Sequence, residues 1–267
     1  MIDLNGIPPF KISTHIERDD YVSPAIRDRG IWEPFETHLF LALLKQGDVV
    51  IDIGANIGWY SLVAALRVGQ SGQVISYEPS AENFALLARN VRINNLTNVR
   101  VSRAAIGDRD TVGNLFLSET NRGDHQLESP DLTRASEPVA IRSLAGVIAT
   151  APSLPAIIKI DTQGSEEKIL ATVLAATVKD TALFVEFWPL GLERSGSSTG
   201  RLLDKLREFG HDIYVIDHAV SRLQSVSLEE LEARAISDLR PESMAFVDLL
   251  CLPKGRDLPI GGHSSIE

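Results

Sequence analysis

Short apolar segments rich in β-branched residues alternate along most of the chain with amphipathic segments, and this alternation is the strongest constraint on the fold. Residues 49–53 (VVIDI) are typical, because the run is almost wholly apolar and is bounded by glycines. Such a run predicts a strand buried on both faces, and the helical spacing after it predicts a crossover helix. Further strands are expected at residues 74–77, 99–101, 156–160, 183–187, 213–216 and 245–250. The pattern predicts an α/β fold with a mostly parallel sheet covered by helices on both faces.

A parallel sheet of this kind also predicts where a ligand binds. Right-handed crossovers bring the carboxyl ends of all parallel strands to one edge of the sheet, and ligands bind at that edge. The residues at or directly after the predicted strand ends are therefore the first candidates for a functional site. They include Gly54, Glu78, Ala105, Asp161 and Glu186.

The chain is expected to have three parts. Residues 1–47 form an N-terminal extension that ends in an amphipathic helix over 32–44, and residues 48–253 form the α/β domain. Residues 254–267 are expected to be a flexible tail. Within the α/β domain, residues 118–138 form a polar segment, and a loop of this length is typical of a lid, a binding loop or a disordered segment.

Charge and cysteine content narrow the function classes. Asp and Glu number 36 against 26 Lys and Arg, so the net charge is -10 and an acidic surface disfavours a nucleic-acid partner. The single cysteine, Cys251, excludes an internal disulfide and a multi-cysteine zinc site. We find no signal peptide and no apolar run of membrane-spanning length, so a cytoplasmic location is expected. A homo-oligomer is compatible with this composition.

The turn after the first strand favours a cationic nucleoside as ligand. It contains Gly54, Asn56 and Gly58 but lacks the third glycine of the dinucleotide fingerprint, and Asp52 precedes it. A carboxylate at this place opposes a pyrophosphate and favours a cation. Glu78 ends the second strand 20 residues beyond Gly58, where an acidic residue typically accepts the ribose hydroxyls. S-adenosylmethionine combines a nucleoside, positive charge and no phosphate.

Four segments resemble the FkbM-type family of S-adenosylmethionine-dependent methyltransferases. They read VVIDIGANIGWYSLVAA, SYEPSAENFALLARNVRINNLTNV, AAIGDRD and IKIDTQGSEEKIL, and the resemblance covers roughly residues 32–190. It implies a Rossmann-like class I methyltransferase fold, with a seven-stranded sheet whose last strand is antiparallel. It also implies methylation of a hydroxyl on a small molecule such as a sugar, a glycan or a natural product. The family pattern K-I-D-V-E-G becomes K-I-D-T-Q-G here, so Gln163 replaces an acidic residue.

The resemblance implies which residues contact the cofactor, and three side chains are candidates for the proton transfer from the acceptor. Ala105 and Ile106 would line the adenine. A hydroxyl acceptor needs a base for its proton, so His, Asp and Glu at the strand ends and in the long loop are the candidates. Asp161, Glu186 and His125 are the predicted catalytic residues, and Asp161 is also expected to contact the cofactor. His218 is a weaker candidate.

No metal site is predicted, because no local spacing demands one, although Asp161 and Glu186 could offer oxygen ligands to a divalent ion. Three other functions stay open at this point. An NAD-dependent oxidoreductase is disfavoured by the missing glycine and by Asp52. A nucleic-acid methyltransferase is disfavoured by the acidic charge. A non-catalytic regulatory protein would bind the cofactor without turning it over.

Overall fold

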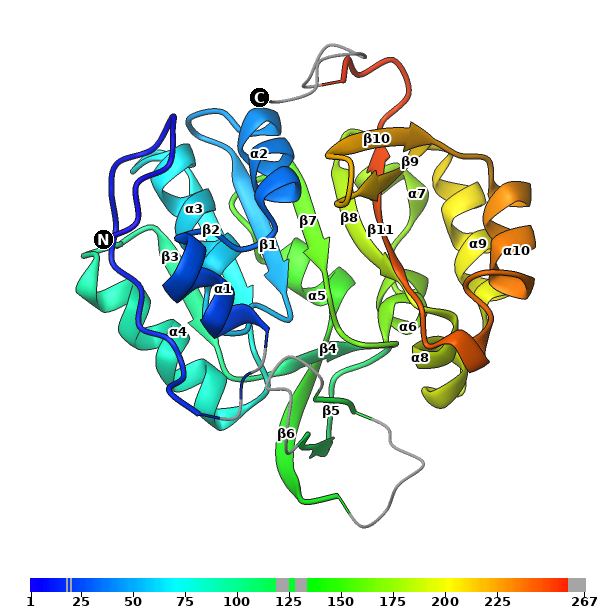
Figure 1. The fold of residues 1–267 in the computed structure, drawn as a ribbon, viewed down its shortest axis with the longest axis horizontal. Helices are drawn as coiled ribbons and strands as arrows, with labels where there is room; N and C mark the ends of the chain where they lie inside the picture. Colours follow the sequence, from blue (N-terminus) through cyan, green and yellow to red (C-terminus); the bar gives the residue numbers. More distant parts are fainter. Residues whose placement is uncertain (18, 20, 119–124, 128–133, 259–267) are drawn as a thin grey trace.

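The computed structural model describes residues 1–258 except 18, 20, 119–124 and 128–133. Its centre is a twisted eight-stranded sheet in the order β10-β9-β11-β8-β7-β1-β2-β3 (Figure 1). The strands of this sheet are β1 (Val49–Ile53), β2 (Gln73–Tyr77), β3 (Val99–Ser102), β7 (Ile157–Ile160), β8 (Ala182–Phe187), β9 (Asp212–Asp217), β10 (Arg222–Ser225) and β11 (Val247–Leu252).

The strand directions confirm the predicted fold class. Strands β3, β2, β1, β7 and β8 pair in parallel, whereas β11 runs antiparallel to both β8 and β9. The sheet has one strand more than the seven predicted, because β10 folds back onto β9 as an antiparallel edge strand. Its sequence RLQS has a single apolar side chain, so hydrophobic patterning could not reveal it.

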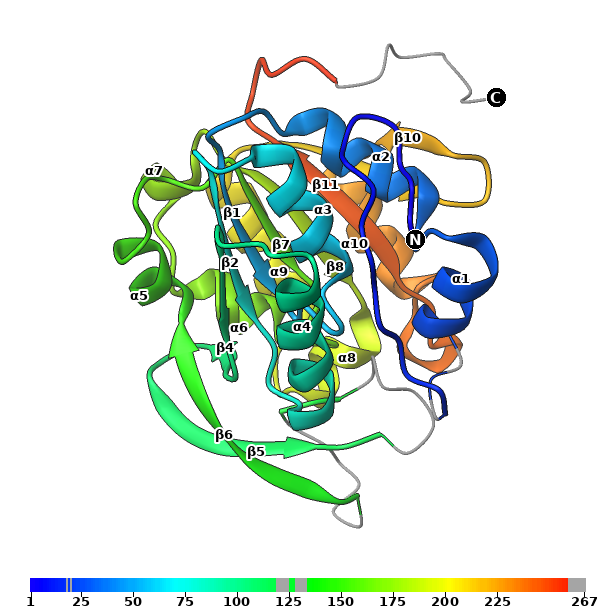
Figure 2. The same ribbon diagram turned by 90° about the vertical axis from the view of Figure 1, so that its left-hand side faces the viewer.

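Helices cover both faces of this sheet, as predicted (Figure 2). One face packs against α5 (Leu144–Ala149), α6 (Glu166–Ala171), α7 (Ala175–Val178), α9 (Thr199–Phe209) and α10 (Leu228–Ile236). The other face packs against α1 (Val22–Arg29), α2 (Pro34–Leu43) and α3 (Trp59–Val68), and α4 (Ala81–Ile93) packs beside them near β3. Two short elements, α8 (Pro189–Arg194) and η1 (Pro241–Ser243), lie near the carboxyl edge.

A second, three-stranded sheet lies below that edge in Figure 1. Its order is β4-β6-β5, with bounds Ala105–Gly107, Ser136–Ser143 and Thr111–Phe116 respectively. The predicted loop over 118–138 is therefore too long at its end, because residues 136–138 belong to β6. An isolated bridge between Phe116 and Gln126 brings the middle of that segment to β5. Residues 119–124 and 128–133 lie outside the described residues.

The N-terminal extension packs along the α1–α3 face of the main sheet. The helix expected over 32–44 is present as α2, and its Leu39 and Phe40 are fully buried. The Phe10 ring contacts the Trp59 ring with centroids 5.8 Å apart. At the other end of the chain, the Arg256 guanidinium donates to the Leu43 carbonyl at 2.9 Å. Among the described residues, no helix has the length and apolar character needed to cross a membrane.

Candidate active site

A row of charged side chains crosses the main sheet on a single face. Asp52 on β1 is the register partner of Lys159 on β7, and Glu186 on β8 is the partner of Asp248 on β11. One residue beyond the β7–β8 pairing, Asp161 comes opposite Glu186. Directly paired residues point to the same side of a sheet, so these side chains share the face that the N-terminal extension covers.

A cleft of about 470 Å³ opens along this row, within the range of typical small-molecule sites. Most of the predicted site residues line it: Asp52, Gly54, Asn56, Glu78, Ala105, Ile106, His125, Asp161 and Glu186. Gly58 does not help to line it. A Cβ there would lie 2.6 Å from the Leu87 side chain, so this glycine permits the close packing of α3 against α4.

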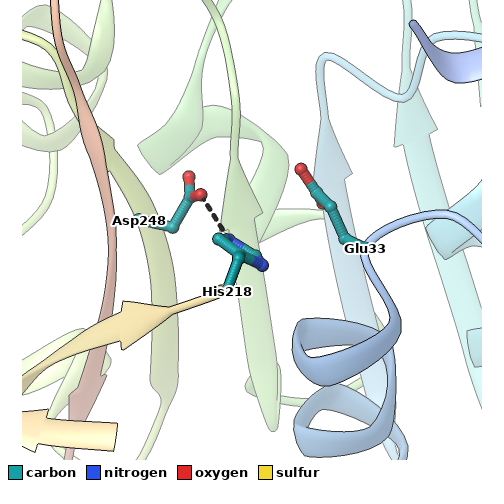
Figure 3. A group of neighbouring side chains, drawn as sticks. All are labelled: Glu33, His218 and Asp248. Carbon is teal, nitrogen blue, oxygen red and sulfur yellow. Dashed lines mark hydrogen bonds and ion pairs between the residues drawn. The ribbon is translucent and has the colours of Figure 1, made fainter. Parts of the chain in front are cut away.

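The end of the cleft that includes Asp248 is formed by segments far apart in the sequence. His218 follows β9, and its Nε2 lies 2.8 Å from Asp248 Oδ2 (Figure 3). Burial alone would lower the pKa of His218, but the hydrogen bond and the charge of Asp248 raise it. Glu33 precedes α2 on the other side and accepts a hydrogen bond from the Tyr60 hydroxyl at 2.8 Å.

Glu78 lies in the opposite half of the cleft and is fixed by the backbone. Its two carboxylate oxygens accept the backbone N–H groups of Asn56 at 2.8 Å and Ser80 at 2.9 Å. Burial raises the pKa of Glu78 to about 7, and burial also raises the pKa of Asp52 to about 6. Asp52 accepts the Ser61 hydroxyl at 2.5 Å, which holds its carboxylate inside the first βα unit.

Gly54 is required by packing rather than by ligand approach alone. The residue has φ +79°, and a Cβ there would lie 1.8 Å from the Asp161 carbonyl oxygen. Any side chain at this place would push β1 and β7 apart at the point where both strands end. The glycine therefore fixes the distance between the first turn and Asp161.

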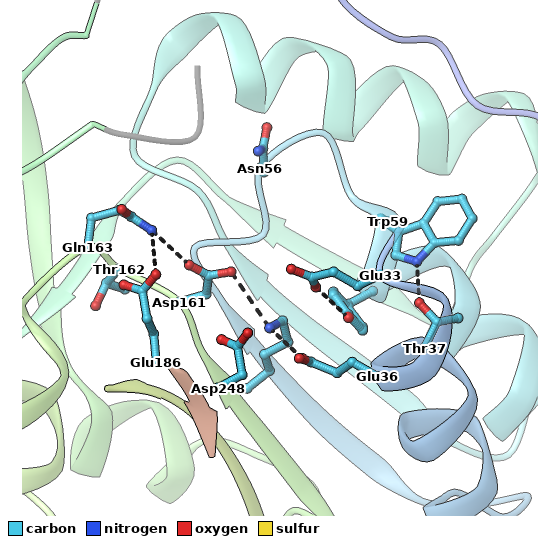
Figure 4. Close-up of polar contacts among 12 residues, drawn as sticks. Glu33, Glu36, Thr37, Asn56, Trp59, Asp161, Thr162, Gln163, Glu186 and Asp248 are labelled. Atoms are coloured by element: carbon cyan, nitrogen blue, oxygen red, sulfur yellow. Dashed lines mark hydrogen bonds and ion pairs between the residues drawn. The ribbon is translucent and has the colours of Figure 1, made fainter. Parts of the chain in front are cut away.

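Gln163 joins the two predicted catalytic carboxylates (Figure 4). Its Nε2 lies 3.2 Å from both Asp161 Oδ1 and Glu186 Oε1, and its backbone has φ +58°. The amide can donate to both carboxylates, whereas the acidic residue of the family pattern would add a third negative charge. The second oxygen of Glu186, Oε2, is buried and accepts no hydrogen bond from the residues described. Burial, and then the charge of Asp161, raise the pKa of Glu186 well above its usual value.

Lys159 also lines the cleft, although it is not among the residues predicted from the sequence. It is buried inside β7, where its Nζ lies 2.8 Å from Glu36 Oε1 and 3.6 Å from Asp161 Oδ2. It also lies over the Tyr60 ring, 4.5 Å from the centroid. The available signal was a lysine between two isoleucines in an apolar strand, because a buried ammonium needs a partner. Glu33, Glu36 and Asp248 were missed for lack of any comparable signal.

His125 is buried and lies in the cleft wall, where its Nδ1 accepts the backbone N–H of Ser118 at 3.0 Å. A neutral imidazole that accepts at Nδ1 carries its proton on Nε2. In this tautomer Nδ1, the basic nitrogen, already accepts the Ser118 N–H, so the ring is a poor base. The geometry thus favours Glu186 over His125 as the proton acceptor.

The charges that line the cleft fit a cationic nucleoside better than a diphosphate. Carboxylates outnumber the basic side chains among the lining residues, which include Lys159 and Arg194. Lys159 is already paired with Glu36. Glu78 offers carboxylate lone pairs to ribose hydroxyls, while Ala105 and Ile106 offer an apolar wall. These groups match the parts of S-adenosylmethionine.

Glu78 provides a prediction for cofactor affinity. An ionised carboxylate accepts ribose hydroxyls best, so affinity for S-adenosylhomocysteine should fall about tenfold per pH unit once the pH drops below about 7. The same raised pKa stabilises the fold of the free protein at low pH, and this contribution is lost as pH rises through about 7. Glu78→Gln should weaken binding about tenfold or more at high pH and flatten the pH dependence, leaving the smaller contribution of Asp52.

Calorimetry between about pH 6 and 8 measures these affinities. Glu82→Gln, at an exposed glutamate in the first turn of α4, is the matched control and should bind as the wild type does. Equal affinities for the wild type and Glu78→Gln would remove Glu78 from the cofactor site.

Comparison with known proteins identifies a family. Residues 52–213 match the family described as Methyltransferase FkbM domain. No curated protein sequence matches the chain. Similar solved structures include precorrin-6y C5,15-methyltransferase from Geobacter metallireducens, with 13% identity, a TM-score of 0.43 and coverage of 80% of this chain and 86% of that one.

Two more solved structures have the same TM-score of 0.43. Fibrillarin from Aeropyrum pernix, in complex with S-adenosyl-L-methionine, has 12% identity, with coverage of 83% of this chain and 76% of that chain. A SAM-dependent O-methyltransferase from Thermotoga maritima has 14% identity, with coverage of 88% and 72% respectively. These likenesses are distant, and nothing about the acceptor of this chain follows from them.

Proposed function

Since the chain belongs to the FkbM methyltransferase family, we propose that it transfers a methyl group from S-adenosylmethionine to a hydroxyl of a small acceptor such as a sugar, a glycan or a natural product. The observation that carries this proposal is the lack of a hydrogen-bond donor to Glu186 Oε2 among the described residues. This buried carboxylate oxygen belongs to a residue of the cleft wall. An acceptor hydroxyl would supply that donor.

The cofactor would occupy the half of the cleft that contains the first turn. Glu78 would accept the ribose hydroxyls, and Ala105 and Ile106 would lie against the adenine. Asp52, Gly54 and Asn56 would form the wall under the methionine part, with Gly58 supporting the turn from behind. When bound, S-adenosylmethionine supplies an activated methyl group on a positively charged sulfur. The carboxylate of Asp161, at the centre of the row, would stabilise that charge.

The acceptor would occupy the other half, between Asp161, Glu186 and Asp248. Burial and the negative charge of Asp161 give Glu186 a higher affinity for protons than an ordinary carboxylate, which suits a general base. Glu186 would take the proton of the acceptor hydroxyl, and Gln163 would hold both carboxylates in place. His125 lies in the wall of the cleft and would contact the acceptor.

The alternative functions make different demands on the cleft. An NAD-dependent oxidoreductase needs a place for a pyrophosphate, and the carboxylates of this cleft disfavour one. A non-catalytic regulatory protein would have no use for an unpaired carboxylate oxygen in the acceptor half. Both alternatives are separable from the proposal by product analysis.

The test is a screen with S-adenosylmethionine and panels of sugars, glycosides, phenols and matched amines. We expect S-adenosylhomocysteine together with a product that carries one O-methyl group, identified by mass spectrometry and NMR. Products methylated only on nitrogen or carbon would contradict hydroxyl transfer. Cofactor binding without S-adenosylhomocysteine formation across the whole panel would favour the regulatory alternative.

A further inference from the structure

Three potential metal-binding side chains meet at the acceptor end of the cleft, although they come from distant segments. Glu33 precedes α2, His218 follows β9, and Asp248 lies in β11; one donor atom from each lies within 4.8 Å of the other two (Figure 3). His218 Nε2 is 2.8 Å from Asp248 Oδ2. Glu33 and Asp248 also line the cleft. Because no local spacing joins these residues, the sequence alone did not predict them as a group.

A fourth side chain supplies an independent indication of a missing ligand. Glu36 is only 1% exposed, and its Oε1 is paired with Lys159. Its other oxygen, Oε2, accepts no hydrogen bond within the described part of the chain and lies 3.8 Å from His218 Nε2. A carboxylate oxygen enclosed in this way loses its hydration without a hydrogen bond in return. A cation beside His218 would offset that cost.

We propose that Glu33, His218 and Asp248, together with Glu36 Oε2, form a binding site for a divalent transition-metal ion such as Zn²⁺ or Mn²⁺. One imidazole and several carboxylates are a donor set that these ions accept. Donor atoms around one such ion lie about 3–3.5 Å apart, given bonds of about 2.1 Å. Binding would therefore require the Glu33 and Asp248 side chains to rotate toward the ion, because the donor atoms lie up to 4.8 Å apart in the structure.

The local charges agree with this assignment. The buried ammonium of Lys159 forms ion pairs with Glu36 and Asp161, and the negative charges of Glu33 and Asp248 also act on it. His218 lies beside Glu36 and Asp248. The simplest rival is a protonated His218 that forms ion pairs with Asp248 and Glu36. In that case the single proton on Nε2 is donated to Asp248 in the 2.8 Å hydrogen bond. Glu36 Oε2 would still have no hydrogen-bond donor among the described residues. A divalent ion can bind both carboxylates and the imidazole at once.

The position of the metal site also suggests that the ion helps to bind the acceptor, an inference that rests on the proposed function. Glu33 and Asp248 bring the ion to the acceptor half of the cleft, opposite Glu78. Four protein donors leave room for oxygen ligands from outside in an expanded coordination shell. We infer that two neighbouring hydroxyls of a sugar-like acceptor would bind there and be oriented for methylation at Glu186.

Metal binding is measured on the full chain without cofactor or acceptor, by competition with a fluorescent zinc chelator and by calorimetry. We expect one Zn²⁺ per chain, weaker binding of Mn²⁺ and little competition by Mg²⁺. His218→Ala should weaken Zn²⁺ binding at least tenfold, and Asp248→Asn should do the same. His38→Ala removes a half-buried histidine on α2 outside the cluster and should bind Zn²⁺ as the wild type does.

Thermal unfolding separates loss of the site from loss of the fold. Zn²⁺ should raise the melting temperature of the wild type and of His38→Ala but not that of a folded His218→Ala protein. Equal Zn²⁺ affinity in the wild type and His218→Ala would overturn the site, as would no binding at all. The readout needs no turnover, so stoichiometric Zn²⁺ binding would stand even if the acceptor screen produced no methylated hydroxyl.

Discussion

Replacing Lys159 by methionine should lower the free energy of unfolding by about 3–5 kcal/mol, because the change leaves Glu36 buried without its cation. The lysine side chain is 6% exposed and that of Glu36 is 1% exposed, so water cannot replace the lost partner. Burial alone would lower the pKa of Lys159, yet the surrounding carboxylates raise it well above its usual value. The ammonium is therefore charged at neutral pH, and urea denaturation measures the cost of removing it.

Two further variants show whether the cost comes from the unpaired carboxylate. Lys159→Met combined with Glu36→Met should recover at least half of the lost stability, because an apolar pair of similar volume needs no partner. Lys205→Met removes a lysine of α9 that pairs with the half-exposed Glu208, and it should cost only about 0–1 kcal/mol. A double variant no more stable than Lys159→Met alone would show that packing, not charge, explains the loss.

The parts of the site that belong to the sheet could be predicted from the sequence. Strand periodicity identified the ends of β1, β2, β7 and β8, and parallel connections brought those ends to one edge. Asp52, Glu78, Asp161 and Glu186 were found in this way, and all four line the cleft. Their convergence is a consequence of topology, which local patterns determine well.

The parts that come from outside this pattern could not be predicted. Glu33 and Glu36 belong to the N-terminal extension, and periodicity does not say which face of a sheet an extension will cover. Asp248 reaches the cleft because β11 runs antiparallel, which brings the beginning of that strand to the edge where the others end. Lys159 alone indicated in the sequence that acidic side chains from elsewhere must lie nearby. An apolar strand can enclose an ammonium only beside a carboxylate.

The glycines show a different limit of sequence reasoning. The turn was identified from Gly54 and Gly58, and both have positive φ. Close approach of a ligand does not explain both glycines. Gly54 packs against the Asp161 carbonyl, and Gly58 packs against Leu87. A motif can thus point to the cleft while its glycines serve the packing that holds the cleft together.

Replacing Glu186 by glutamine should lower kcat for the acceptor found in the screen by about 10²–10⁴-fold. The amide preserves the shape of the side chain but cannot take the hydroxyl proton. Affinity for S-adenosylhomocysteine, measured by calorimetry, should change little, because Glu78 and the first turn lie in the other half of the cleft. The wild-type rate should fall as the pH drops through the raised pKa of Glu186, since the protonated carboxyl is no base, and Glu186→Gln should lose this dependence.

Glu193→Gln, an exposed glutamate of α8 close in sequence to Glu186, is the matched control and should keep the wild-type kcat and pH profile. Because Gln163 donates to both carboxylates, Gln163→Ala tests positioning: kcat should fall less than in Glu186→Gln, and the pH dependence should persist. If Glu186→Gln keeps full turnover with an unchanged pH profile, Glu186 is not the base that takes the proton of the acceptor hydroxyl. Asp161 would then be the next residue to replace, because its carboxylate accepts from the same glutamine, Gln163.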